Sequence, residues 1–286
     1  MSQITLSHGD LHAVIDYHGA ELKSLSKNGK EYMWNADPAY WNRTSPVLFP
    51  FVGAVANKEY RYKGMSYPMG QHGFARDMDF KLVSSSSDRC SFVLHSSEDT
   101  LKKYPFEFEL TISYELSDTG IEVIWDVKNP AEEPLLFSIG AHPAFNCVLD
   151  ATRICIKNSG TPLDSFINSV FGQGLLTQDK KEIKLDNGIM SLNSHSFDGD
   201  AFVIENSQAD QVDVMDNEGN TLLSVAFTSP LVGIWSPPGK NAPFLCIEPW
   251  YGRADKEGFC GELADREWNN TLFSGESFHA SYRIIV

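Results

Sequence analysis

The chain has 286 residues, of which 42% are hydrophobic and 21% are charged, and its 23 lysine and arginine residues against 38 aspartate and glutamate residues give a formal net charge of −15. This composition is that of a globular protein, so it excludes a disordered or fibrous chain. The negative charge disfavours nucleic acids and anionic membranes as partners, because their phosphate groups would be repelled.

The five cysteines, at positions 90, 147, 155, 246 and 260, are odd in number and widely spaced. They form no CxxC pair, which argues against a zinc knuckle or a disulfide framework, and we interpret them as reduced thiols. The first residues show no basic stretch followed by an apolar run, so no secretory signal peptide is expected. These features predict a cytoplasmic protein.

Alternation of apolar and polar residues with a period of two is the dominant pattern along the chain. It occurs at residues 11–17, 106–114 and 121–127, and it recurs around 212–214, at 221–227 and at 278–286. Such alternation predicts strands with one buried face. Turn signals stand at Asn28-Gly29 and at residues 117–120 and 217–220.

Helical signals are weak. Only residues 97–103 suggest a short helix, with Ser97 as a candidate N-cap and Pro105 as the residue that ends it. No linker rich in glycine, serine and proline divides the chain, and no repeat of fixed length is found. The sequence therefore predicts a single all-β domain over residues 1–286, built from many antiparallel strands packed in sheets.

Two segments in the first third of the chain depart from a regular strand pattern. Residues 41–53 place two prolines around an apolar run with Arg43 at its entry, so a regular central strand is not expected there. A core-packing loop with a solvated arginine is an equal alternative. Residues 70–77 combine His72, Arg76 and Asp77 with glycines that permit close backbone approach. A surface or structural role is the more frequent one for such a histidine.

Two later segments place single polar residues in apolar surroundings. His142 lies within residues 138–146, where burial or a neighbouring carboxylate would shift its pKa; the alternative is a hydrogen-bonded core histidine. Glu248 follows an apolar run, where a carboxylate is costly unless it is paired or used. Pro249 is expected to end that strand, and Trp250 offers a flat face for a sugar ring. The alternative is a salt bridge between Glu248 and an arginine.

An acidic stretch at 196–202 either turns one carboxylate inward or forms a hairpin turn, and its composition favours the turn. Glycine-rich nucleotide-binding motifs, a GxSxG elbow, an HxH pair and an EF-hand pattern are absent from the sequence. His8 and His12 have HxxxH spacing, but Gly9-Asp10 between them would break a helix, so a shared metal site is not expected. The available residues fit best a metal-free acid/base site made of a neutral histidine and a glutamate.

Taken together, these segments resemble the aldose 1-epimerase family of galactose mutarotase-like proteins, and within it the LacX-like branch. The resemblance rests on QHGFARD at 71–77, GAHPAFN at 140–146 and the glutamate of CIEPWYGRAD, in that order. It implies a large antiparallel β-supersandwich with few short helices. It also implies an isomerase that interconverts the α and β anomers of a hexose, such as galactose or glucose, without a metal or organic cofactor.

The resemblance implies a role for each matching residue. Glu248 corresponds to the general base and His142 to the general acid, while His72 corresponds to the histidine that holds the sugar and its ring oxygen. Asp200 best matches the family's hydroxyl-binding aspartate, with Asp198 as the close alternative. The implied reaction is ring opening, rotation about the C1–C2 bond and reclosure on the other face.

One departure from the family pattern leaves the substrate open. Where the sugar-specific members carry GRxANR, this chain has Gly53-Ala-Val-Ala-Asn-Lys58, so Lys58, Arg43 or Arg76 would supply the positive charge. Two alternatives follow: a hexose-6-phosphate 1-epimerase, for which these residues and Arg253 would bind the phosphate, and a carbohydrate-binding or sensor protein without turnover. The expected partner is a small-molecule sugar, and the expected state is a monomer or a homodimer.

Overall fold

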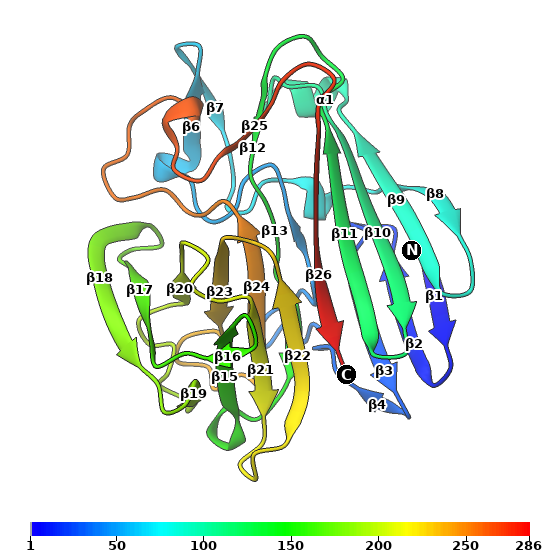
Figure 1. Cartoon of the computed structure of the whole chain (residues 1–286). Coiled ribbons are helices and arrows are strands. Elements are labelled where there is room, and N and C mark those ends of the chain that lie inside the picture. The colour runs from blue at the N-terminus through cyan, green and yellow to red at the C-terminus, as the bar shows by residue number, and fades with distance from the viewer. Residues whose placement is uncertain (1) are drawn as a thin grey trace.

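The computed structural model describes residues 2–286, which form two large antiparallel sheets, a smaller sheet and two separate pairs of strands (Figure 1). The ten-stranded sheet has the order β16-β15-β21-β22-β26-β11-β10-β9-β8, with β19 beside β15. Its strands are β8 (Lys81–Ser85), β9 (Arg89–His95), β10 (Glu109–Ser117), β11 (Gly120–Lys128), β15 (Arg153–Asn158), β16 (Thr161–Pro162), β19 (Ile189–Ser191), β21 (Gln211–Met215), β22 (Thr221–Phe227) and β26 (Ser277–Ile285).

The eight-stranded sheet has the order β18-β17-β20-β23-β24-β13-β5, with β14 beside β24. Its strands are β5 (Val47–Leu48), β13 (Ile139–Ala141), β14 (Ala144–Asn146), β17 (Ser165–Phe171), β18 (Leu176–Lys184), β20 (Phe202–Ile204), β23 (Leu231–Trp235) and β24 (Phe244–Tyr251). This sheet carries most of the polar segments singled out above.

The remaining elements surround these two sheets. Figure 1 shows β6 and β7, with β12 and β25, at the upper end of the molecule. The four-stranded sheet is β1 (Gln3–His8), β2 (Leu11–Asp16), β3 (Leu22–Lys27) and β4 (Lys30–Glu31), and the two pairs are β6 (Glu59–Tyr62) with β7 (Met65–Pro68) and β12 (Leu135–Phe137) with β25 (Asn270–Leu272). The helices are α1 (Glu98–Leu101) and the 3₁₀ turns η1 (Ala56–Lys58), η2 (Ala75–Asp77), η3 (Leu149–Ala151) and η4 (Leu263–Asp265). None of these helices, within residues 2–286, has the length and apolar composition needed to cross a membrane.

The structure confirms the all-β fold and the turns expected from the sequence. Asn28 and Gly29 both have positive φ, at 52° and 78°, and join β3 to β4, while Ser117 pairs with Gly120 at the β10–β11 hairpin. The expected strand at 106–114 begins only at Glu109 in β10, although alternate side chains are buried from residue 106 onward. The expected helix at 97–103 is shorter, since α1 ends at Leu101, four residues before Pro105; Ser97 caps it by accepting a hydrogen bond from the Thr100 backbone N–H.

One face of strand β24 packs into the main core, and the polar residues of the candidate site lie on its other face. Leu245 and Ile247 point into the main core, which also contains Phe92 and Trp125 of the ten-stranded sheet. Successive side chains of a strand point to opposite faces, so residues 246, 248 and 250 lie on the side away from that core.

The expectation that Pro249 ends this strand is wrong, because β24 continues to Tyr251. The backbone N–H of Ile247 donates to Pro143 O, so the nitrogen of Pro249, two residues on, faces the same side. On that side, β24 pairs with β13 at Trp250 and with β14 at Cys246. The ladder of hydrogen bonds is interrupted between these two positions. A proline at such a break removes no ladder hydrogen bond.

A buried hydroxyl ties the ten-stranded sheet to the N-terminal sheet. Tyr114 Oη of β10 donates to Ala20 O over 2.6 Å. Tyr114→Phe is expected to lower the free energy of unfolding by about 1–2 kcal/mol, because the buried carbonyl loses its partner. Denaturant unfolding measures this change. Tyr67→Phe is the control, since the Tyr67 hydroxyl contacts only Met65 Sδ, at 3.9 Å, among the residues described. Equal effects of the two substitutions would contradict the assignment.

Candidate active site

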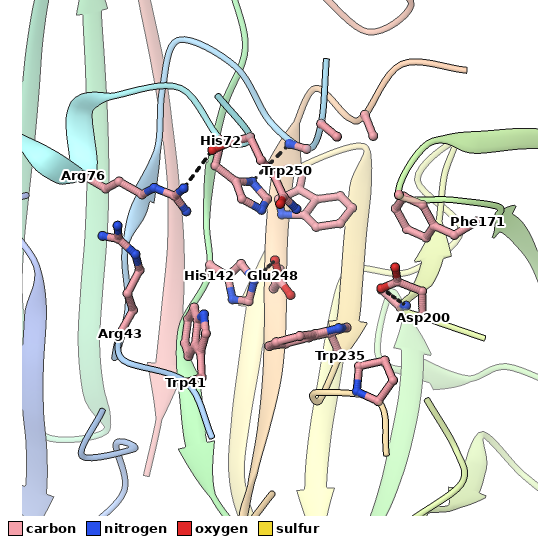
Figure 2. Close-up of a pocket in the computed structure, with 17 residues that line it drawn as sticks. Trp41, Arg43, His72, Arg76, His142, Phe171, Asp200, Trp235, Glu248 and Trp250 are labelled. Carbon is pink, nitrogen blue, oxygen red and sulfur yellow. Dashed lines mark hydrogen bonds and ion pairs between the residues drawn. The ribbon is translucent and has the colours of Figure 1, made fainter. Parts of the chain in front are cut away.

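A cavity of about 420 Å³ opens on the face of the eight-stranded sheet that turns away from the main core (Figure 2). Its volume is within the usual range for small-molecule sites. The side chains labelled in Figure 2 that line it are Trp41, Arg43, His72, Arg76, His142, Phe171, Asp200, Trp235, Glu248 and Trp250.

A histidine and a glutamate meet at the centre of this cavity. Glu248 projects from β24 opposite Gly233 of β23, and His142 lies in the break between β13 and β14, where its backbone N–H donates to Pro46 O. His142 Nε2 lies 3.3 Å from Glu248 Oε2, and both side chains are buried. Within residues 2–286, His142 Nδ1 and Glu248 Oε2 have no aligned hydrogen-bond partner. The pair therefore has unused hydrogen-bonding capacity.

Burial shifts the pKa values of these two groups in opposite directions. It raises the pKa of Glu248 well above 4.5, and the negative charge of Asp200 adds to this effect while the Trp250 indole N–H opposes it. Burial lowers the pKa of His142 from 6.5 to about 3, and the positive charge of Arg76 contributes in the same direction. Both shifts disfavour charge, so burial favours a neutral pair that holds one exchangeable proton, on Glu248.

The ring of His72 is fixed by a reciprocal pair of bonds with Gly53. The backbone N–H of His72 donates to Gly53 O over 2.9 Å, and the backbone N–H of Gly53 donates to His72 Nδ1 over 3.1 Å. Burial lowers the pKa of His72 well below 6.5, so the ring is neutral, and since Nδ1 accepts, Nε2 carries the proton. His72 is thus a hydrogen-bond donor in the wall of the cavity, held at a φ of 67°.

The loop that contains Gly53 packs against residues 254–255 and is held there by hydrogen bonds. A Cβ at Gly53 would lie 2.4 Å from Ala254 N, so only glycine fits this approach. The buried carboxylate of Asp255 accepts from the Ala56 backbone N–H and from Arg266 Nε, and Asp255 N–H donates to Ala54 O. These contacts join residues 53–56 to residues 253–255. The hydrogen bonds between Gly53 and His72 then hold the His72 ring in place.

Aromatic rings surround the central pair. Trp41 stacks on His142 with 4.6 Å between ring centroids, and Trp235 meets the same ring edge-on at 5.4 Å. Trp250 lies across two glycines of the neighbouring strands, since a Cβ at Gly140 or Gly233 would come within 2.7 Å or 2.4 Å of its indole. These rings keep water from the pair and offer apolar faces to a ligand.

Charged groups occupy opposite sides of the cavity, as Figure 2 shows, with two arginines on one side and Asp200 on the other. Arg43 and Arg76 both approach Asp77, at 2.7 and 3.7 Å, and Arg76 also donates to Gln71 O. Burial and the nearby Arg43 lower the pKa of Arg76 from 12.5 to about 10, which still leaves it charged at neutral pH. Asp200 has a φ of 75°, a left-handed conformation in which its Oδ1 accepts from the Ala201 backbone N–H.

The structure brings together six of the residues proposed from the sequence and leaves Lys58 and Arg253 outside. The residues at the cavity are Glu248, His142, His72, Arg43, Arg76 and Asp200. Lys58 is exposed and is not among the lining residues, and Arg253 is buried in ion pairs with Glu205 and Glu267. Asp198 bonds to His195 within the turn at 194–199, so the acidic stretch is a turn whose last aspartate reaches the cavity.

Sequence reasoning missed Trp235 and Phe171. Trp235 ends the apolar run of β23 directly before Ser-Pro-Pro, which is the same kind of signal that singled out Glu248. Phe171 ends β17 and carries no comparable signal.

Comparison with known proteins gives a consistent result. The model of the aldose 1-epimerase family matches residues 2–284. Protein LacX of Lactococcus lactis subsp. lactis, in its plasmid and chromosomal forms, is 31% identical over an alignment 281 residues long that covers 94% of this chain and 94% of LacX. The solved structure of a galactose mutarotase related enzyme from Lactobacillus acidophilus is 30% identical, with a TM-score of 0.92 over 99% of this chain and 97% of that one. A galactose mutarotase-like protein from Lactobacillus casei is 31% identical, with a TM-score of 0.92 over 99% of both chains.

The raised pKa of Glu248 has a consequence for stability. Above pH 4.5 the unfolded chain releases this proton while the folded chain keeps it, so the contribution of Glu248 to the free energy of unfolding falls as pH rises toward the folded pKa. Glu248→Gln removes this dependence. The variant is expected to gain stability relative to the native protein between pH 4 and pH 8. Denaturant unfolding at both pH values tests this, with the exposed Glu257→Gln as control. A stability difference that does not change with pH would contradict the shift.

Proposed function

The chain belongs to the aldose 1-epimerase family, and we propose that it interconverts the α and β anomers of a free hexose, such as galactose or glucose, in the cavity around Glu248 and His142. The observation that carries the proposal is the 3.3 Å contact between these two buried groups, one of which accepts a proton as the other gives one. No metal ion or organic cofactor is needed for the steps that follow.

The proposed reaction moves one proton at each of two oxygens. The Glu248 carboxylate removes the proton of the anomeric hydroxyl, and the His142 imidazolium protonates the ring oxygen as the C1–O5 bond breaks. The resulting aldehyde turns about the C1–C2 bond. Reclosure returns the proton of Glu248 to the new anomeric oxygen and restores the proton of His142, so the enzyme ends in its starting state.

This scheme needs one exchangeable proton shared by Glu248 and His142. Burial favours that protonation state, because it disfavours a charge on either group. In the empty cavity that proton is on Glu248, and hydrogen bonds from sugar hydroxyls to the carboxylate favour its transfer to His142. Because the two atoms are 3.3 Å apart, the transfer requires only a small movement. The neighbouring Arg43 and Arg76 oppose a charged imidazole, so the imidazolium is a strong acid when it forms.

The walls of the cavity suit a pyranose ring. The indoles of Trp41, Trp235 and Trp250 offer faces for its C–H bonds, while His72 Nε2–H is a donor for a ring or hydroxyl oxygen. We propose that Asp200 accepts hydrogen bonds from sugar hydroxyls on its side of the cavity. Arg43 and Arg76 donate hydrogen bonds to the sugar from the opposite side.

A second candidate is a hexose-6-phosphate 1-epimerase. Arg43 and Arg76 support it, because two guanidinium groups beside one half-exposed carboxylate, that of Asp77, leave positive charge at the cavity for an anionic substituent. Lys58 and Arg253, which the sequence also suggested for this role, lie outside the lining. A carbohydrate sensor without turnover is the third candidate, and the acid–base contact argues against it.

Anomer exchange is the direct test, measured by saturation-transfer NMR on galactose, glucose and their 6-phosphates. The native protein is expected to exchange the anomers of a free hexose, and Glu248→Gln is expected to lower the rate by about 10²–10⁴-fold through loss of the base. Exposed Glu257→Gln is the matched control. Exchange only with 6-phosphates would favour the second candidate, and sugar binding without any exchange would favour the sensor.

The pH dependence of kcat/KM tests the shared proton. On the acid side, activity is expected to be lost when His142 is protonated while Glu248 still carries its proton. Because burial lowers the pKa of His142, this loss is expected at a pH of about 3 rather than 6.5. It is expected to be lost on the alkaline side when the pair gives up its one proton, above the raised pKa of Glu248. Circular dichroism at each pH separates these limbs from unfolding. An acid limb near 6.5 in the folded protein would contradict the proposed protonation state.

A further inference from the structure

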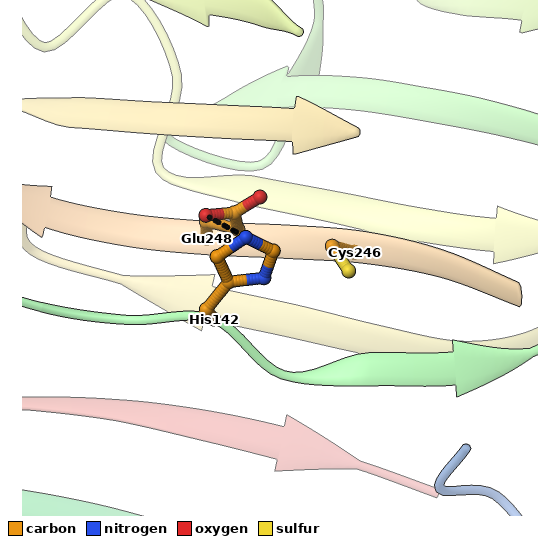
Figure 3. A group of neighbouring side chains, drawn as sticks. All are labelled: His142, Cys246 and Glu248. Atoms are coloured by element: carbon orange, nitrogen blue, oxygen red, sulfur yellow. Dashed lines mark ion pairs between the residues drawn. The ribbon is translucent and has the colours of Figure 1, made fainter. Parts of the chain in front are cut away.

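A third potential ligand lies beside the acid–base pair. Cys246 is two residues before Glu248 on β24, so the two side chains share a face, and Cys246 pairs with Ala144, two residues after His142. Figure 3 shows the thiol of Cys246 and the carboxylate of Glu248 on either side of the His142 ring. One ligand atom from each of the three residues lies within 4.8 Å of the other two. Cys246 is fully buried and is not among the residues that line the cavity.

Two buried polar atoms in this cluster lack a hydrogen-bond partner. Within the described part of the chain, His142 Nδ1 and Glu248 Oε2 are buried and have no aligned hydrogen-bond partner. A buried polar atom in that condition is unfavourable until something satisfies it. A sugar in the adjacent cavity would be one such partner, and for Glu248 Oε2 a cation held between the three side chains would be another.

The separations of the ligand atoms can reach those of a tetrahedral site, with His142 Nε2 as the nitrogen ligand, after a small side-chain movement. Nitrogen and oxygen ligands at about 2.0–2.1 Å from a zinc ion are about 3.3 Å apart, which matches the distance between His142 Nε2 and Glu248 Oε2. A sulfur ligand at about 2.3 Å would lie roughly 3.6 Å from each of them, so a side-chain movement of about 1 Å closes the site from its 4.8 Å limit.

We propose that His142, Cys246 and Glu248 form a binding site for Zn²⁺, and that the bound ion inhibits the enzyme by occupying its acid and its base. A thiolate, an imidazole and one carboxylate suit zinc rather than Mg²⁺ or Ca²⁺, which prefer oxygen ligands in larger number. Zinc held by three protein ligands keeps a fourth position for water or a sugar hydroxyl, and two of the three ligand residues, His142 and Glu248, line the cavity. The inhibition rests on the proposed function, whereas the binding site does not.

The test separates metal binding from catalysis by replacing the one ligand that the reaction does not use. Equilibrium dialysis with ZnCl₂ is expected to show one tightly bound ion per native chain. Cobalt(II) at the same site is expected to give a thiolate-to-cobalt charge-transfer band. Cys246→Ser is expected to abolish this band and to weaken zinc binding by on the order of 10–100-fold or more, since even the loss of an outer-shell partner has an effect on that scale. Cys260→Ser, at an exposed cysteine, is the matched control and is expected to change neither result.

Anomer exchange supplies the second measurement. Zinc is expected to inhibit the native protein and Cys260→Ser, while Cys246→Ser keeps its rate and resists zinc. Cys246→Ala provides a second replacement if serine disturbs folding, which circular dichroism checks. Zinc binding by both Cys246 variants with native affinity, or no charge-transfer band in the native protein, would overturn the site. A band without any anomer exchange would support the site and contradict the proposed function instead.

Discussion

The contact between Glu248 and His142 is shielded from water, and the rest of the site depends on this shielding. An isolated charge on either group would cost several kcal/mol in such surroundings, so the stable arrangement is a neutral pair with one proton. The surrounding elements maintain this condition. Trp41 and Trp235 cover the imidazole, and the Asp255–Arg266 ion pair holds the loop that fixes His72.

Much of the fold could be predicted because its longest strands each bury one face. Strands β10, β11 and β26 show clean alternation of burial, and the expected ranges of these three and of β22 agree with the structure to within a few residues. The strands that sequence reasoning missed lack that signal for two physical reasons. β18 is almost entirely exposed and polar, while β13 and β14 have three residues each and are buried on both faces for most of their length.

The site was partly predictable for a related reason. His142 and Glu248 stand out because burying such groups in apolar runs is costly without a use. Trp235 did not stand out, because a tryptophan in a core strand is ordinary. The location of Lys58 could not be foreseen: it follows Asn57 in η1, both residues have positive φ, and the Lys58 side chain is exposed rather than at the cavity. The effect of Pro249 depended on a break in a neighbouring ladder, which no local sequence encodes.

The spacing of residues along β24 limits how this protein can change in evolution. The thiol, the carboxylate and the indole that face outward occur at every second position of one continuous strand, and the residues between them belong to the core. Insertion or deletion of a single residue in this strand would exchange the two faces, placing apolar side chains at the cavity and a carboxylate in the core. A change of length in β24 would therefore disturb both faces at once, whereas a substitution affects one side chain. Variation in loop length is left to segments such as 172–175 and 237–242, which approach the cavity from its rim.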